Sequence, residues 1–305
     1  MANKIILADE RLDGITKSNL KLSAWTKFKV LYGARPSISR SNITMLIYFV
    51  PLLLVILLSG TNVSAINAML PFGGYGAVGY PLSLYAPAQA AALIRENTKT
   101  TLLLAAGGLV IFSIALAGSL KVIRNGILSI AVNKEGYAVS AFNHKRDNLR
   151  GMRENLPVTF LVALVWAAAA NGVFYLFIAL EGMAPALAIA IQIAAILLAA
   201  LLLLYGFYVM CLWAGYRQRL GKVLKNAFFM MFQNMRLNIV GLLITLAPVS
   251  LLFTGQYIID LLVLMYHAMI GFAVIVYTWL SISIKIENKY PKYKTVKETA
   301  PADAQ

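Results

Sequence analysis

The segment "APALAIAIQIAAILLAALLLLYGFYVMCL", Ala184 to Leu212, contains no charged residue. A helix that crosses a bilayer needs roughly 20 predominantly apolar residues, so this segment is long enough to span one. The rest of the chain has the same character: 60% of its 305 residues are hydrophobic and 13% are charged. Soluble domains are usually about 45–50% apolar and about a quarter charged. The sequence therefore predicts an all-α, polytopic transmembrane helical bundle.

Other apolar runs divide the chain into a membrane domain, 43–284, and two polar ends. Residues 1–42 form a basic cytosolic N-terminal segment, and residues 285–305 form a polar cytosolic tail. The stretch "KLSAWTKFKVLYGARP" fits an interfacial amphipathic helix and equally fits a partly ordered tail. We predict six spans in the membrane domain, at 43–59, 101–120, 157–180, 184–212, 237–254 and 257–284.

The basic residues alternate from one inter-span segment to the next. Of the 27 Lys and Arg residues, 25 fall in alternate segments and 2 in the others. Segments rich in Lys and Arg stay in the cytoplasm, so both termini are predicted to be cytoplasmic. The chain is therefore expected to be a multi-pass membrane protein. The net charge of +15 is then mainly a topology signal, and we expect no nucleic-acid binding.

The long external segment, 60–100, is rich in glycine and proline. Its central part, "PFGGYGAVGYPLSLYAP", begins at Pro71, and such a composition indicates irregular backbone. Residues 76–94 carry no charge. They fit an ordinary loop or a re-entrant segment, which would need shelter by protein or water.

Two basic stretches of similar wording follow apolar runs. They are "KVIRN", Lys121 to Asn125, and "KVLKN", Lys222 to Asn226. An internal duplication and two unrelated membrane exits both fit this similarity. We predict that these stretches and the helices after them form one cytosolic platform, in which Phe142, Phe228 and Met231 face the bundle. The basic residues that face water or lipid headgroups are Arg124, Arg150, Lys225 and Arg236. The candidate partner or lipid contacts are Lys121, Arg124, Phe142, Arg150, Arg153, Lys222, Lys225, Phe228 and Arg236.

Four polar residues lie within or near the predicted spans: Asn171, Gln192, Asp260 and His267. A charge at the bilayer centre costs at least about 2.5–3.5 kcal/mol, so such residues deserve inspection as functional candidates. We expect structural roles for all four. Asp260 is predicted at the outer interface, His267 in a hydrogen bond to a neighbouring helix, and Asn171 and Gln192 in interhelical hydrogen bonds.

No pattern of catalytic residues is apparent in the sequence. The spans contain no paired carboxylates, histidine cluster or Ser-His-Asp set. No nucleotide-binding glycine motif occurs. The single cysteine, Cys211, cannot form a disulfide within one chain. We therefore expect a protein that is not an enzyme and has no cofactor or metal.

One run, "AGSLKVIRNGILSIAVNKEGYAVSAFNHKRDNLRGMRENLPVTFLVAL", resembles the YesL family of bacterial membrane proteins. A second patch, "VLKNAFFMMFQNMRLNIVGLL", is similar to the entry to that family's fifth span, and together the two cover about 117–245. The resemblance implies a compact bundle of five or six helices in the cytoplasmic membrane of a bacterium, often associated with carbohydrate ABC importers. The matching residues are Ala117, Gly118, Arg124, Asn125, Glu135, Phe142, Asn155, Leu156, Asn226, Arg236 and Asn238.

Three functions are compared. The first is an accessory membrane protein of YesL type, which binds partners through basic amphipathic cytosolic elements. Its expected partners are the anionic inner leaflet and either ABC transporter subunits or further copies of itself. The second is a stand-alone transporter or channel for a small solute, favoured by Pro51, Pro185 and Pro248 within spans. The third, an ABC permease subunit, lacks the expected Glu-Ala-Ala coupling motif.

Overall fold

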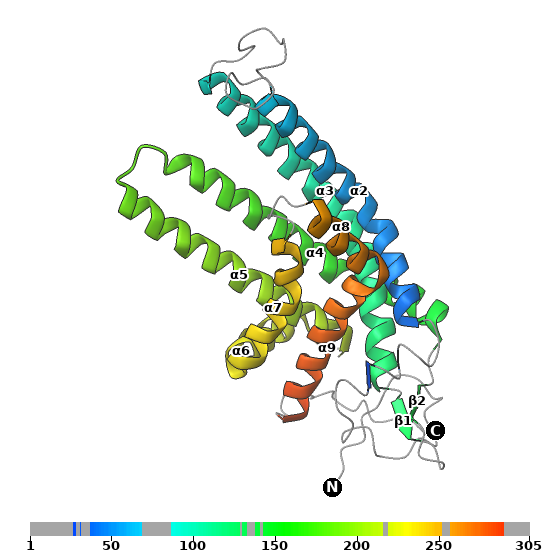
Figure 1. The fold of residues 1–305 in the computed structure, drawn as a ribbon. Coiled ribbons are helices and arrows are strands. Elements are labelled where there is room, and N and C mark those ends of the chain that lie inside the picture. Colours follow the sequence, from blue (N-terminus) through cyan, green and yellow to red (C-terminus); the bar gives the residue numbers. More distant parts are fainter. Residues whose placement is uncertain are drawn as a thin grey trace.

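The computed structural model describes residues 27–28, 31, 37–68, 87–128, 130–132, 138–140, 143–215, 219–251 and 257–289. These residues form a bundle of long helices with one small antiparallel hairpin (Figure 1). The predicted helical bundle is confirmed, and the hairpin was not predicted. The elements are α2 Ser37–Ala68, α3 Pro87–Leu128, β1 Ile130–Val132, β2 Ala138–Ser140, α4 His144–Ala179, α5 Pro185–Gly215, α6 Leu220–Gln233, α7 Met235–Leu251, α8 Tyr257–Tyr266, η4 His267–Gly271 and α9 Phe272–Lys289.

Five of the described helical segments are long and apolar enough to cross a membrane. A sixth span exists only if α6 and α7 count as one, and these two helices meet at an angle of 97°. The predicted fifth span, 237–254, therefore corresponds to one arm of a bent pair rather than to a straight helix. The five segments are Ile38–Val63, Ala91–Leu128, His144–Ala179, Pro185–Gly215 and Leu261–Ile286.

The helices α2 and α3 extend well beyond the predicted spans. Only the Gly- and Pro-rich centre of the external segment 60–100 was predicted to be irregular, and on either side of it α2 continues to Ala68 and α3 begins at Pro87. Residues 87–94 are thus the start of a long helix and not part of a re-entrant segment, while residues 69–86 lie outside the described residues. The polar parts of α2 and α3 near this segment are linked by a hydrogen bond, in which the side-chain nitrogen of Asn97 donates to the Ser59 hydroxyl at 3.0 Å.

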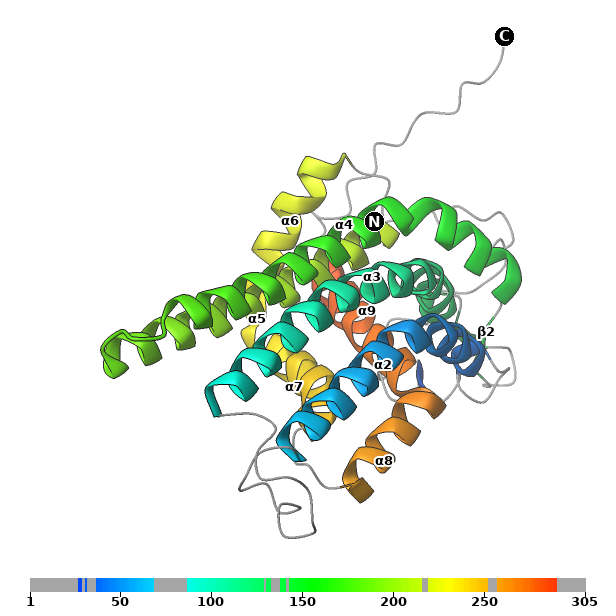
Figure 2. The ribbon, with the colours of Figure 1, turned by 90° about the horizontal axis from the view of Figure 1, so that it is seen from above.

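The third predicted span and the surface helix before it are one continuous helix, α4. Its first turn is capped by Asn143, whose side-chain oxygen accepts from the Arg146 amide at 3.2 Å. The helix passes through Pro157 without ending. Figure 2 shows that its N-terminal part curves around the edge of the bundle. The amphipathic stretch before Pro157 is therefore part of the same helix as the third predicted span and not a separate element.

Two helical hairpins diverge from a shared lower end. The pair α2–α3 and the pair α4–α5 point in different directions in Figure 1, and α9 packs between them. Trp279 of α9 is buried at the centre and stacks on Phe207 of α5, with ring centroids 4.9 Å apart. Its indole nitrogen donates to Thr245 of α7 at 2.9 Å. This one side chain thus connects three helices.

The helices approach one another most closely at glycines. A Cβ atom built on Gly151 of α4 would lie 2.9 Å from the carbonyl oxygens of Ala117 and Gly118 of α3. A Cβ on Gly206 of α5 would likewise meet the Trp166 ring of α4 at 2.6 Å. Lipid gives no hydrophobic drive for helix association, so close packing at small residues supplies much of the attraction.

The outer faces of the helices carry large exposed apolar side chains. Leu103 of α3 is 71% exposed and Ile258 of α8 is 72% exposed. A soluble monomer rarely exposes such extended apolar surface. This surface fits the hydrocarbon of a bilayer, as expected for a membrane protein.

We predict that Gly151→Ala destabilises the bundle, because the added methyl group meets helix backbone that cannot move aside. Overpacking of this kind costs about 1–3 kcal/mol. The matched control is Gly107→Ala in α3, where a Cβ meets nothing within 4 Å. Thermal unfolding in detergent should show a lower melting temperature for Gly151→Ala alone. Equal melting temperatures for the two variants would contradict this packing.

Candidate functional site

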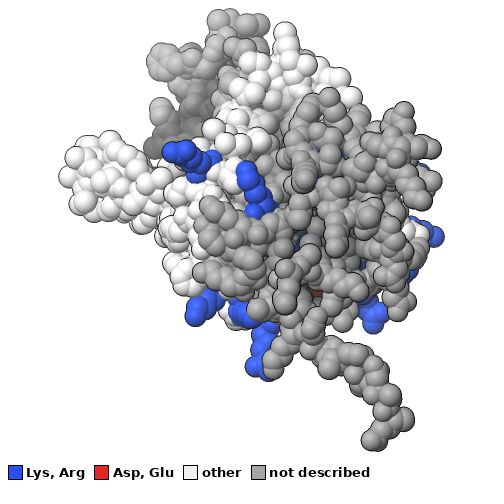
Figure 3. Space-filling view, turned by 90° about the horizontal axis from the view of Figure 1, so that it is seen from below, with Lys and Arg blue, Asp and Glu red and all other residues white. Residues whose placement is uncertain are grey.

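Exposed basic side chains gather at the lower end of the bundle, where α4 begins and α9 ends (Figure 3). At the opposite end, the described residues carry both signs of charge: Arg95, Glu96, Lys99 and Glu181. The charge asymmetry in the sequence is therefore also an asymmetry in space. The exposed basic residues at the lower end are Arg40, Lys145, Arg146, Arg153, Arg219, Lys222, Lys225, Arg236 and Lys285.

Arg124 is not at this surface, although it was predicted to face water or lipid headgroups. Only 7% of it is exposed, because α3 continues for another turn beyond it. Its guanidinium group lies over Gly215 at the end of α5, where a Cβ would come within 2.5 Å of it. The absence of a side chain at Gly215 makes room for the buried arginine.

Lys121 and Arg150 form ion pairs with Glu154 rather than a free basic surface. The Arg150 Nε atom lies 2.7 Å from the Glu154 carboxylate, and the Lys121 side chain is 14% exposed. The backbone carbonyl of Glu154 accepts from the indole nitrogen of Trp213 at 3.1 Å. The Glu154 cluster, formed by these four residues, joins α3, α4 and α5. Arg153 points outward, as predicted.

The helix α6 presents its phenylalanines outward, contrary to prediction. Phe228 is 52% exposed, whereas Met231 is buried as expected. The helix packs on α5, where the Tyr205 hydroxyl donates to the Leu224 carbonyl at 3.1 Å. Lys222, Lys225 and Arg236 are exposed, in agreement with the prediction.

The predicted cytosolic platform does not form. The start of α4 and the helix α6 lie on opposite sides of the lower end in both ribbon views (Figures 1 and 2). The stretch Lys121 to Asn125 lies within the spanning helix α3, whereas Lys222 to Asn226 lies in the short helix α6. The similar wording therefore occurs in different local structures. Phe142 lies outside the described residues.

The polar residues predicted within the spans bond mainly to their own helices. His267 is buried, and its Nδ1 atom lies 2.8 Å from the carbonyl of Val263, one turn earlier. Asn171 donates to the carbonyl of Ala167 at 2.9 Å, also within one helix. These hydrogen bonds of the two side chains stay within their own helices, whereas bonds to neighbouring helices were predicted. Gln192 is half-buried on α5, and the side chain of Asp260 lies outside the described residues.

Asn42 of α2, which sequence reasoning missed, makes the contact with the helix of His267. Its side-chain nitrogen donates to the carbonyls of His267 and Ala268 at 2.9 and 2.8 Å. Its side-chain oxygen accepts from the Ala273 amide at 3.0 Å. The two carbonyls belong to the π turn η4, where the regular helical hydrogen bonding is interrupted, and the amide lies two residues beyond it in α9. The only sequence signal was a polar residue directly before an apolar run.

Two further asparagines act in the same way. Asn155 of α4 is 3% exposed and donates to the carbonyl of Ala117 in α3 at 2.9 Å. Asn238 of α7 is 1% exposed, donates to the carbonyl of Met231 in α6, and accepts from the Tyr208 hydroxyl of α5. Both belong to the residues that carry the YesL resemblance. Their observed role is to hold helices together.

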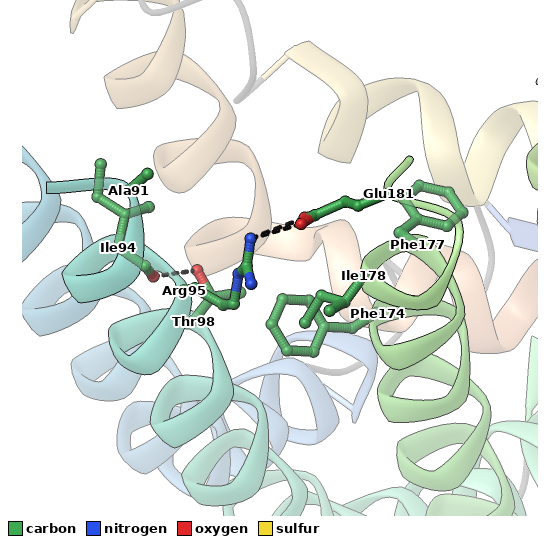
Figure 4. A pocket seen from close by; sticks show the side chains of 8 residues that line it. All are labelled: Ala91, Ile94, Arg95, Thr98, Phe174, Phe177, Ile178 and Glu181. Atoms are coloured by element: carbon green, nitrogen blue, oxygen red, sulfur yellow. Dashed lines mark hydrogen bonds and ion pairs between the residues drawn. The ribbon is translucent and has the colours of Figure 1, made fainter. Parts of the chain in front are cut away.

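A groove opens between α3 and α4 near the end opposite the basic surface (Figure 4). Its volume is about 460 Å³. Arg95 reaches across it to Glu181, with an N–O distance of 2.7 Å, and the phenyl rings of Phe174 and Phe177 line one side. The remaining lining residues are Ala91, Ile94, Thr98 and Ile178.

Neither the described residues nor comparisons with known proteins identify a catalytic or metal-binding site. Within the part of the chain that the structure describes, no group of three or more His, Cys, Asp or Glu side chains could hold a metal ion. No protein-family model, curated protein or solved structure gives a significant match to the chain. The YesL resemblance therefore stays a prediction.

We predict that Asn42→Ala destabilises the protein, because it removes two hydrogen bonds to carbonyls of the π turn and one from the Ala273 amide of α9. Each buried group left unsatisfied costs about 1–3 kcal/mol. The matched control is Asn62→Ala in the same helix, where the side chain is exposed and bonds to Asn97 at 3.1 Å. Thermal unfolding in detergent should separate the two variants clearly. A loss at Asn62 as large as that at Asn42 would contradict the assigned role.

Proposed function

We propose that this protein is an accessory membrane protein of YesL type, which binds a partner membrane protein, such as a carbohydrate ABC importer, at its basic end. The observation that carries the proposal is the exposed basic surface at the start of α4, which includes Lys145 and Arg153. This surface belongs to a helix that the Glu154 cluster fixes to α3 and α5, so it is a rigid feature of the bundle. The resemblance over 117–245 supports the same assignment.

The buried polar side chains agree with a binding role. The side chains of Asn42, Asn155 and His267 form hydrogen bonds with helix backbone. The side chain of Asn238 bonds to a backbone carbonyl and to the Tyr208 hydroxyl. A proton or ion pathway needs polar groups that can exchange partners. Side chains that satisfy backbone groups in the bundle are committed to structure instead.

We place the basic end in the cytoplasm. The helix α2 begins, and α9 ends, toward the same end of the bundle (Figure 1). Positively charged residues remain on the cytoplasmic side during insertion, so an end rich in Lys and Arg belongs there. A cytoplasmic position also gives the start of α4 access to the cytosolic parts of a transporter.

We predict that a cysteine at Lys99 is labelled from outside intact cells, whereas one at Lys145 is labelled only after permeabilisation. Both positions are exposed and lie toward opposite ends of the bundle. The native Cys211 is 1% exposed and is replaced by alanine as a precaution. A membrane-impermeant maleimide gives the readout. External labelling at Lys145→Cys would overturn the proposed orientation.

A stand-alone solute transporter is the second candidate. The observation that favours it is the groove between α3 and α4, where an ion pair joins two helical hairpins. Breaking and remaking such a pair could accompany a movement of one hairpin against the other. This candidate predicts solute uptake by vesicles that contain the purified protein alone.

We predict that the double variant Lys145→Glu/Arg153→Glu loses its partner in a pull-down from solubilised membranes, because the changed charges repel a complementary acidic surface. The control Lys99→Glu alters an exposed lysine at the other end and should retain the partner. Recovery of an ABC ATPase or permease with the unchanged protein supports the proposal. Uptake by the lone protein that the variant Arg95→Ala abolishes would favour the transporter instead.

A further inference from the structure

We infer that α6 is an interfacial helix whose outward face binds the anionic phospholipid headgroups of the inner leaflet. This assigns one of the two basic regions to lipid and leaves the start of α4 for a protein partner. The inference stands on the geometry of α6, and it deepens the proposed function by separating anchoring from partner binding.

The length and direction of α6 fit a helix that lies along the membrane surface. It has 14 residues and is about 21 Å long, which is too short to cross a hydrocarbon core of roughly 30 Å. It meets α7 at 97°, so it runs across the direction in which α7 enters the bundle. Figure 2 shows α6 at the edge of the assembly, where a surrounding bilayer would meet it.

The inward face of α6 is fully occupied by the bundle. Val223, Ala227 and Met230 are 0% exposed and Met231 is 4% exposed. The helix is therefore held in place by packing whether or not its other face has a partner. Its outward face is exposed at this end of the protein.

The outward face combines basic and aromatic side chains along its length. Arg219, Lys222 and Lys225 are exposed near its start. Phe228, Phe229 and Phe232 are 47–52% exposed near its end, and their rings touch at centroid distances of 5.2 and 6.0 Å.

Phospholipid matches both parts of this face. Lysine and arginine can extend their apolar stems along hydrocarbon while their charged ends reach the phosphates. The phenylalanines can enter the boundary between headgroups and acyl chains. No acidic residue occurs between 213 and 236, so the charge is uniformly complementary to an anionic surface.

The outward face of α6 is also continuous with surface that lipid must already cover. The next helix, α7, exposes Ile239, Val240 and Leu243 at 49–60% on its outside. Since α7 passes from the end of α6 into the membrane domain, lipid around these side chains reaches the phenylalanines of α6 next. A water-soluble partner would have to displace it.

Quenching by brominated lipid tests the inference on the full protein in vesicles. A bimane fluorophore is attached at Phe232→Cys in the Cys211→Ala background, and brominated phosphatidylglycerol is compared with brominated phosphatidylcholine. We expect quenching by both lipids, with preferential binding of phosphatidylglycerol at low salt. Replacing Lys222 and Lys225 by glutamine should reduce the preference roughly fivefold for each charge removed. Raising the salt concentration should reduce it further.

Two controls make the result specific. Lys99→Gln removes a lysine at the opposite end and should leave the preference unchanged. Bimane at Leu197→Cys, on the exposed side of α5, should be quenched equally by the two lipids because α5 contains no Lys or Arg.

Three outcomes would overturn the inference. Absence of quenching by either lipid at position 232 would show that water, a second copy or another protein covers this face. Equal quenching by the two lipids, or a preference that survives Lys222→Gln/Lys225→Gln, would show that the basic residues do not bind headgroups. None of these readings depends on a partner protein, so failure of the pull-down leaves this experiment interpretable.

Discussion

The hydrogen bonds of Asn42 satisfy backbone groups at the π turn, where the long helix from α8 to α9 is interrupted. The helix from α8 to α9 changes register at η4, and inside a membrane no water is present to serve the freed backbone groups. One asparagine on α2 supplies a donor to two carbonyls and an acceptor to one amide. This contact ties α2 to the helix that carries Trp279.

Close contact at glycines also fixes α3 against α4. Gly118 and Gly151 let α3 and α4 approach until backbone meets side chain, and Asn155 then reaches the carbonyl of Ala117. The Glu154 cluster adds charge pairing at the same end of these helices. Because α3 and α4 are fixed together there, the two hairpins can diverge at the opposite end and leave the groove that Arg95 and Glu181 bridge.

The basic end has two surfaces with different surroundings. Among the residues that the structure describes, the start of α4 carries Lys145 and Arg153 with no exposed aromatic cluster beside them, whereas α6 combines its lysines with three exposed phenylalanines. Charge alone suits a protein or a headgroup, but an exposed aromatic cluster next to charge suits the boundary of a bilayer. The proposed roles, partner binding at α4 and lipid anchoring at α6, follow from this difference.

The sequence by itself determined the membrane class, the helical fold and the approximate location of the spans. Composition and run length suffice for these, because hydrocarbon permits few backbone structures. The roles of particular residues were decided only by tertiary structure. Arg124 looks like a surface cation in the sequence, yet it is buried because α3 continues past it and Gly215 leaves space. Phe228 looks like a core residue in the sequence, yet it is exposed because α6 packs on α5 through its other face. Burial depends on which helix packs where, and local pattern does not contain that information.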